Sequence, residues 1–230
     1  AQSEAANCCQ FANYWVHNGY INVDNRKMSK SLGNFFTVRD VAKEFDYEVI
    51  RFFMLSAHYR SPINFSKDLM ESASSALERI YTCMDTLKFL KETASGEDAR
   101  PEEIPVLEAV NGYKQKFIDA MDDDLNTADA ISAIFEIVSE VNKNVTSASE
   151  PSEYLIEYIL SVFDELGSVL GILGRKEKEA VPDEVKEMLE ERKNARADKD
   201  WAKSDLIRDK LKDFGYSVKD TAQGQQLIKL

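Results

Sequence analysis

The chain has 230 residues, 43% of them hydrophobic, and a formal net charge of −12. This length predicts two or three compact units, and the apolar content is ordinary for a globular protein with a buried core. No apolar run approaches the roughly 18 residues of a membrane span. The first residues lack a signal-peptide pattern and do not begin with methionine. We therefore expect a soluble, cytoplasmic protein that has been processed or is part of a longer one.

Cysteine and histidine are too sparse for a disulfide framework or a complete metal site. The three cysteines, Cys8, Cys9 and Cys83, include one adjacent pair and no C-x-x-C spacing. The two histidines, His17 and His58, are far apart in sequence. The sequence therefore predicts reduced thiols, as in the cytoplasm. It also predicts that no metal site is complete within the chain.

The acidic excess is confined to the middle of the chain. Residues 1–69 carry eight basic and seven acidic side chains, residues 70–182 carry ten and twenty-three, and residues 183–230 carry eleven of each. A strongly acidic surface repels nucleic acid. The distribution permits a nucleic-acid surface at the two ends and disfavours one between them.

Residues 11–23 predict a β-hairpin near the start of the chain. They are rich in aromatic and β-branched side chains around Asn18-Gly19, a pair typical of tight hairpin turns. Trp15 and His17 would lie on the first strand, as a core tryptophan and a histidine with satisfied hydrogen bonds.

Two helix starts are predicted after this hairpin. Thr37 is followed three residues later by Asp40, which is the spacing of a capping box. Asp46 precedes an apolar run at 47–59, which predicts a helix buried on more than one side.

From about residue 67 to residue 173 the pattern is helical. Apolar residues recur at intervals of three and four in four stretches, with loops expected at 93–105 and 145–152. Four amphipathic helices with short connections predict an antiparallel bundle.

A run of three acids, Asp122-Asp123-Asp124, stands before Asn126 at the predicted start of the third bundle helix. Acidic side chains and caps are favoured there, because the first amides of a helix are free and its dipole is positive. We therefore favour capping and a junction over a magnesium site.

The end of the chain predicts a small separate unit. Residues 174–184 are charged and poor in apolar residues, as is typical of a hinge. Helices are expected at about 183–198 and 200–213, and residues 215–230 predict a terminal β-hairpin.

The stretch DNRKMSKSLGNFFTVRDV, residues 24–41, is the most distinctive in the chain. Lys27 and Lys30 alternate with a methionine and hydroxyl residues before a glycine, which suits contact with phosphates. No Walker-type or G-x-G-x-x-G loop is present. A lysine-rich loop by itself is more often solvated surface than a binding site.

The segment Lys27-Met28-Ser29-Lys30-Ser31 is identified as the signature loop of class I aminoacyl-tRNA synthetases. With NYWVHNG, HYRSPINFS, AMDDDLNTADA and ARADKDW, it makes essentially the whole chain resemble cysteinyl-tRNA synthetases. The resemblance implies ATP-dependent activation of cysteine and its transfer to cysteine tRNA, with magnesium-bound ATP as a substrate.

The resemblance also implies roles for the loop residues. Lys30 and Lys27 would be catalytic, because lysines on a loop can stabilise the charge that develops on the departing pyrophosphate. Lys27, Met28, Ser29, Lys30 and Ser31 would bind ATP, with Met28 near the adenine.

Other parts of such an enzyme are expected in an N-terminal half that precedes this chain. Residues 17–20, HNGY, do not match the family's H-x-G-H motif, because tyrosine stands in place of the second histidine. The family's zinc selects cysteine through its thiolate, and its ligands lie in that half as well. Cys8 and Cys9 are weak substitutes, so we expect the chain alone not to activate cysteine.

By resemblance, the anticodon contacts are Arg196, Trp201, Asp205 and Asp220. A tryptophan face can stack an unpaired base. Arginine and aspartate can read base edges with opposite donor and acceptor patterns. Trp201 has an alternative role as the core residue of a small helix pair.

We therefore expect a mainly α protein in four parts. These are the tail of a class I synthetase catalytic fold with a hairpin and signature loop (1–36), stem-contact helices (37–68), a helical bundle (69–174) and an α+β anticodon-recognition unit ending in a hairpin (175–230). In the second part, Tyr59 and Arg60 would touch the acceptor stem or brace the loop.

Two alternative functions stay open. One is a free-standing tRNA-binding module without catalysis. The other is the related ligase that joins cysteine to a glucosaminyl-inositol, which has no use for an anticodon-reading tail. A purely structural bundle is disfavoured by the intact signature loop.

Overall fold

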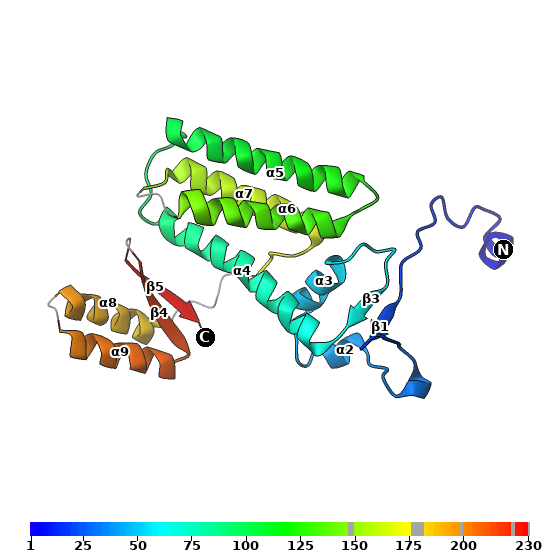
Figure 1. Cartoon of the computed structure of the whole chain (residues 1–230), viewed down its shortest axis with the longest axis horizontal. Coiled ribbons are helices and arrows are strands. Elements are labelled where there is room, and N and C mark those ends of the chain that lie inside the picture. Colours follow the sequence, from blue (N-terminus) through cyan, green and yellow to red (C-terminus); the bar gives the residue numbers. More distant parts are fainter. Residues whose placement is uncertain (147–149, 176–181, 198–199, 222–223, 230) are drawn as a thin grey trace.

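The structure is a computed structural model, and it describes residues 1–146, 150–175, 182–197, 200–221 and 224–229. Its elements fall into three groups: a small sheet with short helices, a four-helix bundle, and a terminal unit of two helices and a hairpin (Figure 1). The prediction of a mainly helical chain is confirmed. Within these ranges, no helix is both long and apolar enough to cross a membrane.

A three-stranded sheet follows helix α1 (Gln2–Asn7) and an extended segment, and its strand order is β2-β1-β3. Strand β1 (Ile21–Val23) pairs antiparallel with β2 (Arg26–Lys27) and parallel with β3 (Ile63–Phe65). Asp24 and Asn25 connect β1 to β2 with φ angles of 48° and 61°. Two successive left-handed residues give the twist that a two-residue hairpin turn favours.

The prediction of a hairpin turn at Asn18-Gly19 is wrong. Residues 11–20 form no strand, and the N–H of Gly19 donates instead to the carbonyl of Tyr59 at 2.6 Å. A Cβ atom at Gly19 would lie 2.3 Å from the carbonyl oxygen of Ser61. The glycine is therefore required by a close approach of two backbones and not by a turn.

Both predicted helix starts are confirmed. Helix α2 (Val38–Val41) begins after Thr37, which forms reciprocal capping bonds with Asp40. Helix α3 (Tyr47–Leu55) begins after Asp46, whose carboxylate accepts a hydrogen bond from the N–H of Glu48 at 2.8 Å.

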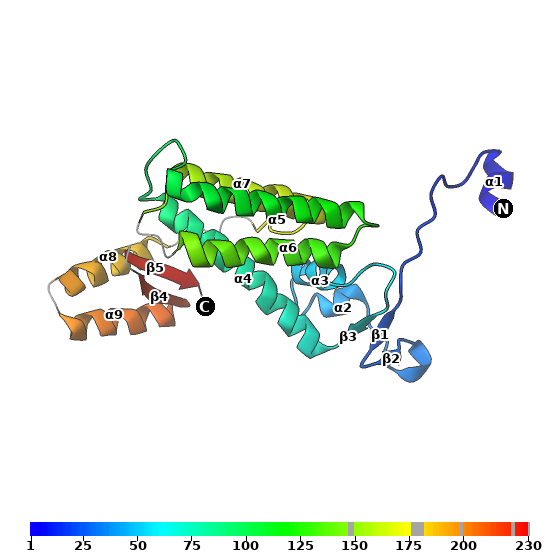
Figure 2. The ribbon, with the colours of Figure 1, turned by 45° about the horizontal axis from the view of Figure 1, so that its top comes forward.

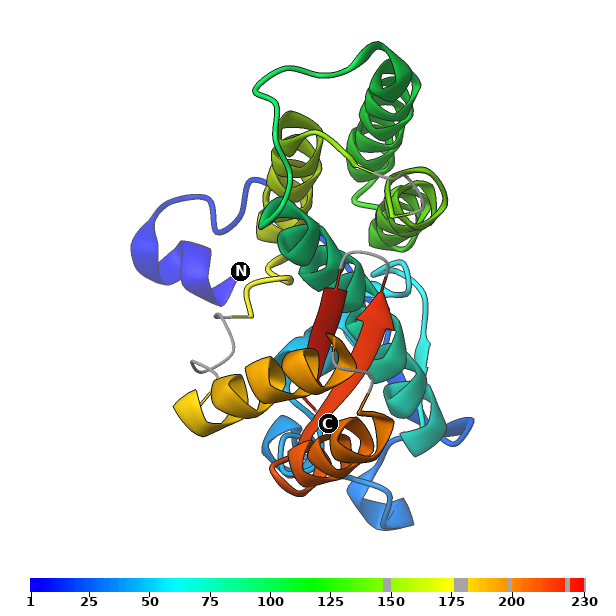
Figure 3. The same cartoon turned by 90° about the vertical axis from the view of Figure 1, so that its left-hand side faces the viewer.

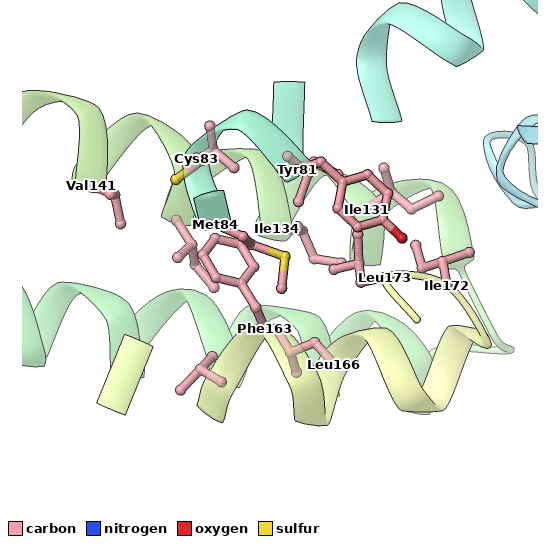
Figure 4. Close-up of a cluster of buried hydrophobic side chains, with 14 of the residues drawn as sticks. Tyr81, Cys83, Met84, Ile131, Ile134, Val141, Phe163, Leu166, Ile172 and Leu173 are labelled. Atoms are coloured by element: carbon pink, nitrogen blue, oxygen red, sulfur yellow. The ribbon is translucent and has the colours of Figure 1, made fainter. Parts of the chain in front are cut away.

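The predicted bundle is also confirmed. It consists of α4 (Lys67–Lys91), α5 (Ile104–Asp122), α6 (Thr127–Glu140) and α7 (Glu153–Leu170). A 3-10 turn, η2 (Pro101–Glu103), precedes α5, and a π-helical turn, η3 (Val141–Val145), continues α6. Side chains of the bundle helices meet in one continuous apolar core (Figure 4).

Helix α4 connects the bundle to the sheet. Its cap, Ser66, directly follows β3, and its 25 residues extend roughly 37 Å at 1.5 Å per residue. One end of α4 lies beside β3 and the other end packs in the bundle (Figure 2). The sheet is thus attached to the bundle by a continuous helix.

The terminal unit contains α8 (Asp183–Ala197), α9 (Trp201–Asp213), and the antiparallel strands β4 (Tyr216–Thr221) and β5 (Gly224–Lys229) (Figure 3). It has its own small core of Val185, Ile207, Leu211 and Tyr216. The predicted helix pair and hairpin are confirmed. Most of the predicted hinge, at 176–181, lies outside the described residues.

Candidate nucleotide and nucleic-acid sites

The signature loop begins at the end of β2 and contains the 3-10 turn η1 (Lys30–Leu32). Lys27 is the last residue of β2, and Lys30 is the first of η1. The side chains of Lys27 and Ser31 are exposed, whereas Met28 and Ser29 are half-buried. This arrangement presents the loop to solvent on one side of the small sheet.

Asn34 closes the loop onto itself. Its side-chain amide donates to the carbonyl of Lys27 at 3.2 Å, and its side-chain oxygen accepts the N–H of Ser29 at 2.9 Å. The hydroxyl of Ser29 also lies 2.9 Å from that of Ser31. Sequence reasoning gave the Asn34 side chain no role, although asparagine side chains commonly hydrogen-bond to nearby backbone groups in turns.

The base of the loop is attached to the strand that leads into α4. The N–H of Asn25 donates to the side-chain oxygen of Asn64 at 2.7 Å, and the N–H of Asp24 donates to the carbonyl of Phe65 at 3.1 Å. Because Ser66 then caps α4, the position of the loop base is fixed relative to that helix.

A second connection joins the segment after α3 to the turn between α5 and α6. The hydroxyl of Tyr59 donates to Asp124 at 2.8 Å, and the guanidinium of Arg60 lies 3.1 Å from the same carboxylate. Asn126 caps α6 by accepting the N–H of Asp129. The predicted junction role of this acidic run is confirmed through Asp124, whereas the side chain that caps α6 is Asn126, outside the run. Tyr59 and Arg60 brace the bundle turn.

The predicted strand positions of Trp15 and His17 are wrong, since neither residue lies in a strand. Trp15 is 68% exposed and contacts the ring of Phe11 at 5.8 Å between centroids. Trp15 is therefore not a core residue of this chain.

The terminal unit brings three of the four predicted anticodon residues together. The guanidinium of Arg196 lies 5.5 Å from the ring centroid of Trp201, and its Nη1 is 3.1 Å from Oδ2 of Asp220. Trp201 is 57% exposed, so the alternative role as a core residue is wrong. The arrangement offers an exposed tryptophan ring with an anchored cation over it and an anchored acid next to that cation.

Asp205 is not part of these contacts. It lies one helical turn after Trp201 on α9, on the same side of the helix, and pairs with Arg208 at 3.2 Å. Sequence reasoning missed Arg192, which is 1% exposed and holds Asp220 through two hydrogen bonds. Its bond from Nη1 to Oδ1 is 2.9 Å long, and its bond from Nη2 to Oδ2 is 3.0 Å long.

The residues present do not fit the zinc that the resemblance implies. Cys8 and Cys9 are exposed at the end of α1. Over the described ranges, no group of three or more His, Cys, Asp and Glu side chains is arranged to hold a metal ion.

Comparisons with known proteins assign families to these parts of the chain. The family model of the tRNA synthetases class I (C) catalytic domain matches residues 1–75, that of the DALR domain matches residues 116–174, and that of the cysteinyl-tRNA ligase anticodon binding domain matches residues 178–227.

A curated cysteine–tRNA ligase from Lachnospira eligens is 49% identical over 97% of this chain, which covers 47% of that protein. The chain thus spans about half the length of this relative. A crystal structure of the Agrobacterium radiobacter K84 LeuRS in a ternary complex with tRNA and LeuAMS has the same fold over 68% of the chain and 22% of its own length. The TM-score is 0.52 and the identity 24%. Over nearly all of its length, the chain is therefore similar to part of a cysteine–tRNA ligase.

Proposed function

We propose that this chain is part of a cysteine–tRNA ligase that activates cysteine with ATP and transfers it to cysteine tRNA. In this proposal the chain supplies the signature loop and the anticodon-reading surface. The partners are cysteine tRNA, magnesium-bound ATP, cysteine and an N-terminal half of the ligase, in the cytoplasm. That half would provide the H-x-G-H motif and the zinc ligands.

The signature loop would act on the phosphates of ATP. Activation breaks the bond between the α-phosphate and pyrophosphate, so negative charge develops on the departing group. Lys30 and Lys27 would stabilise that charge in the transition state. Met28, Ser29 and Ser31 would complete the ATP contacts, with Met28 near the adenine and Asn34 keeping the loop closed.

The terminal unit would read the anticodon. The exposed face of Trp201 suits stacking of an unpaired base, an interaction worth about 1–3 kcal/mol. Arg196 would donate to a base edge, and the carboxylates of Asp220 and Asp205 would accept from one. The contact of Arg196 with both Trp201 and Asp220 is the observation that carries this assignment.

The two sites lie at opposite ends of the molecule, since the signature loop is at one end and the terminal unit at the other (Figure 1). A tRNA has its reactive end and its anticodon at opposite ends as well. In this proposal the chain divides into a catalytic remnant (1–36), stem-contact helices (37–68), a bundle (69–174) and an anticodon unit (175–230).

Binding of the chain to a cysteine tRNA transcript, compared with a transcript of changed anticodon, tests the anticodon assignment. We expect the native anticodon to bind more tightly. Trp201→Ala should weaken binding by roughly tenfold, the equivalent of about 1.4 kcal/mol. Trp15→Ala is the control, because it removes another exposed tryptophan, outside the terminal unit. Equal binding of both transcripts by the unchanged chain would contradict the assignment.

Cysteine-dependent exchange between ATP and pyrophosphate by the whole ligase tests the loop assignment. Lys30→Ala should lower the exchange rate by at least tenfold, whereas Lys67→Ala, which removes an exposed lysine paired with Glu44, should not. An undiminished rate in the Lys30 variant would contradict a catalytic role. Normal tRNA binding by a whole protein that shows no exchange would favour the free-standing binding module.

A further inference from the structure

The hairpin of the terminal unit places a carboxylate on the side that faces the helices. Alternate residues of a strand share one face, so Tyr216 and Val218, which contribute to the small core, share that face with Asp220. Asp220 pairs in register with Gln225 of β5. An inward-facing carboxylate is costly unless a charged partner meets it.

Arg192 of α8 is that partner. Its side chain is 2% exposed, although arginine is rarely buried so completely. Two parallel hydrogen bonds join its guanidinium to the two oxygens of Asp220, and Nη1 also donates to the side-chain oxygen of Gln225. A bidentate pair fixes the orientation of a carboxylate as well as its position.

Arg196 stands one helical turn after Arg192 and reaches the same carboxylate. Residues four apart lie on one face of a helix, and Nη1 of Arg196 contacts Oδ2 of Asp220 while its guanidinium lies over Trp201. Asp220 thus connects one fully buried arginine with one that is 36% exposed. The exposed residues of the proposed anticodon surface are held from beneath by a side chain that cannot itself touch RNA.

We propose that Arg192 is a positioning residue for base recognition: it fixes the Asp220 carboxylate and, through it, the Arg196 guanidinium beside the face of Trp201. This inference rests on the proposed anticodon-reading function of the unit. Arg192 would act without contacting the base, whereas Asp220, whose side chain is 41% exposed, would make the contact.

The arrangement also limits which base edge is accepted. Hydrogen bonding to Arg192, opposed by partial burial, holds the pKa of Asp220 below its usual value. Asp220 therefore stays ionised and can only accept hydrogen bonds. A base that presents an N–H donor, such as the amino group of cytosine or adenine or the N–H edge of guanine, would be bound. A carbonyl in the same place would be rejected.

The test compares binding of a cysteine tRNA transcript with binding of transcripts changed at single anticodon positions, for the unchanged chain, Arg192→Met and Arg192→Lys. We expect Arg192→Met to reduce the discrimination ratio at one anticodon position by roughly tenfold. Arg192→Lys, which keeps the charge but not the paired bonds, should give a smaller reduction. Lys193→Met is the matched control, since it removes one exposed charge from the next position of α8 and should weaken all transcripts equally.

A double-variant cycle separates positioning from general stabilisation. If Arg192 acts through Asp220, then Asp220→Asn should reduce the same ratio, and adding Arg192→Met to it should reduce the ratio no further. In the free chain, carboxyl NMR titration should show the pKa of Asp220 rising in the Arg192→Met variant. Contacts between Val218 and Leu227, which pair across the hairpin, report whether the unit is folded.

Each outcome of these measurements either supports or overturns the positioning role of Arg192. An unchanged discrimination ratio in a folded Arg192→Met variant would overturn the positioning role and leave the proposed function intact. The same holds if the reductions caused by Arg192→Met and Asp220→Asn add up in the double variant. If the Arg192→Met variant unfolds, an unchanged discrimination ratio in the Arg192→Lys variant would overturn the positioning role. A lack of anticodon preference in the unchanged chain would overturn the proposed function, and the inference with it.

Discussion

The hydroxyl of Tyr59 donates a hydrogen bond of 2.8 Å to the carboxylate of Asp124, which lies 65 residues further along the chain. The same tyrosine accepts the N–H of Gly19 through its backbone carbonyl at 2.6 Å. Tyr59 therefore touches both the segment that leads into β1 and the turn between two bundle helices. The stretch around the signature loop is tied to the bundle at this residue as well as through α4.

The bond between Tyr59 and Asp124 should contribute measurably to stability. Tyr59→Phe and Asp124→Asn should each lower the free energy of unfolding by about 1 kcal/mol, because a hydrogen bond to a partly exposed charge is lost. Asparagine is preferred to alanine at 124 because φ there is 58° and asparagine tolerates the left-handed region. Urea unfolding of both single variants and of the double variant measures the coupling free energy between the two side chains. We expect this coupling to be about 1 kcal/mol.

Asp122→Asn is the control for this cycle, since Asp122 is exposed and belongs to the same acidic run. Its effect should stay within about 0.5 kcal/mol. Additive losses in the Tyr59 and Asp124 double variant would show that the two side chains do not interact in solution.

Local patterns predicted the helices and their caps because the information is contained within a few residues. Thr37 and Asp40 satisfy each other across one turn, and the apolar repeat of α7 requires only its own sequence. The terminal hairpin likewise follows from two short runs. Contacts between residues that are close in sequence can therefore be predicted from local sequence patterns.

Contacts between distant residues explain what the sequence did not reveal. The pair Asn18-Gly19 resembles a turn, but Gly19 serves a close approach to Ser61, 42 positions away. In the sequence, Arg192 is one more charged residue of a highly charged helix. The structure shows that Arg192 is buried because it pairs with Asp220, which lies on the strand face toward the helices. The alternation of Tyr216, Val218 and Asp220 was the available signal for that partner.

Gly19→Ala should destabilise the region around the signature loop. The added Cβ would lie 2.3 Å from the carbonyl oxygen of Ser61, so two backbone segments must separate, at a cost of about 1–3 kcal/mol. Hydrogen exchange of the amide of Ile63, which donates to the carbonyl of Tyr20 at 3.1 Å, should become faster. In contrast, Gly112→Ala, in open space within α5, should stabilise the chain by about 0.5–1 kcal/mol. Equal effects of the two substitutions would contradict the close approach.

The three thiols should react at two very different rates. Cys8 and Cys9 are exposed, whereas Cys83 is 2% exposed, and burial raises the pKa of its thiol to about 12. Because the thiolate is the reactive form, a disulfide reagent at pH 8 should modify two cysteines rapidly and the third only on unfolding. Cys83→Ala should leave the rapid phase unchanged, whereas Cys8→Ala should remove half of it. Rapid reaction of all three thiols in the folded chain would contradict the packing of α4.

Glu103 should make the stability of the bundle depend on pH in the acid range. Its carboxylate accepts the N–H and the hydroxyl of Ser152, at 2.7 and 2.6 Å, and the N–H of Arg100 at 2.9 Å. Burial acts to raise the pKa of Glu103, but these hydrogen bonds outweigh it and leave the pKa below 4.5, its usual value. The unfolded chain then binds the proton more readily than the folded chain. The stabilisation is fully present above pH 4.5 and is lost as the pH falls through the folded-state pKa.

Glu103→Gln should therefore lower the free energy of unfolding by about 1–3 kcal/mol at pH 7, because the amide NH2 replaces one carboxylate oxygen and then faces the N–H donor of Ser152 or of Arg100. The difference between the unchanged chain and this variant should shrink steadily below pH 4.5. Glu102→Gln, at the exposed neighbouring position, should show little difference at any pH. Denaturant unfolding between pH 3 and pH 7 measures all three proteins. A difference for Glu103→Gln that stays constant over this range would mean that the carboxylate has the same pKa in the folded and unfolded chains, so that its hydrogen bonds to Ser152 and Arg100 do not favour the ionised form.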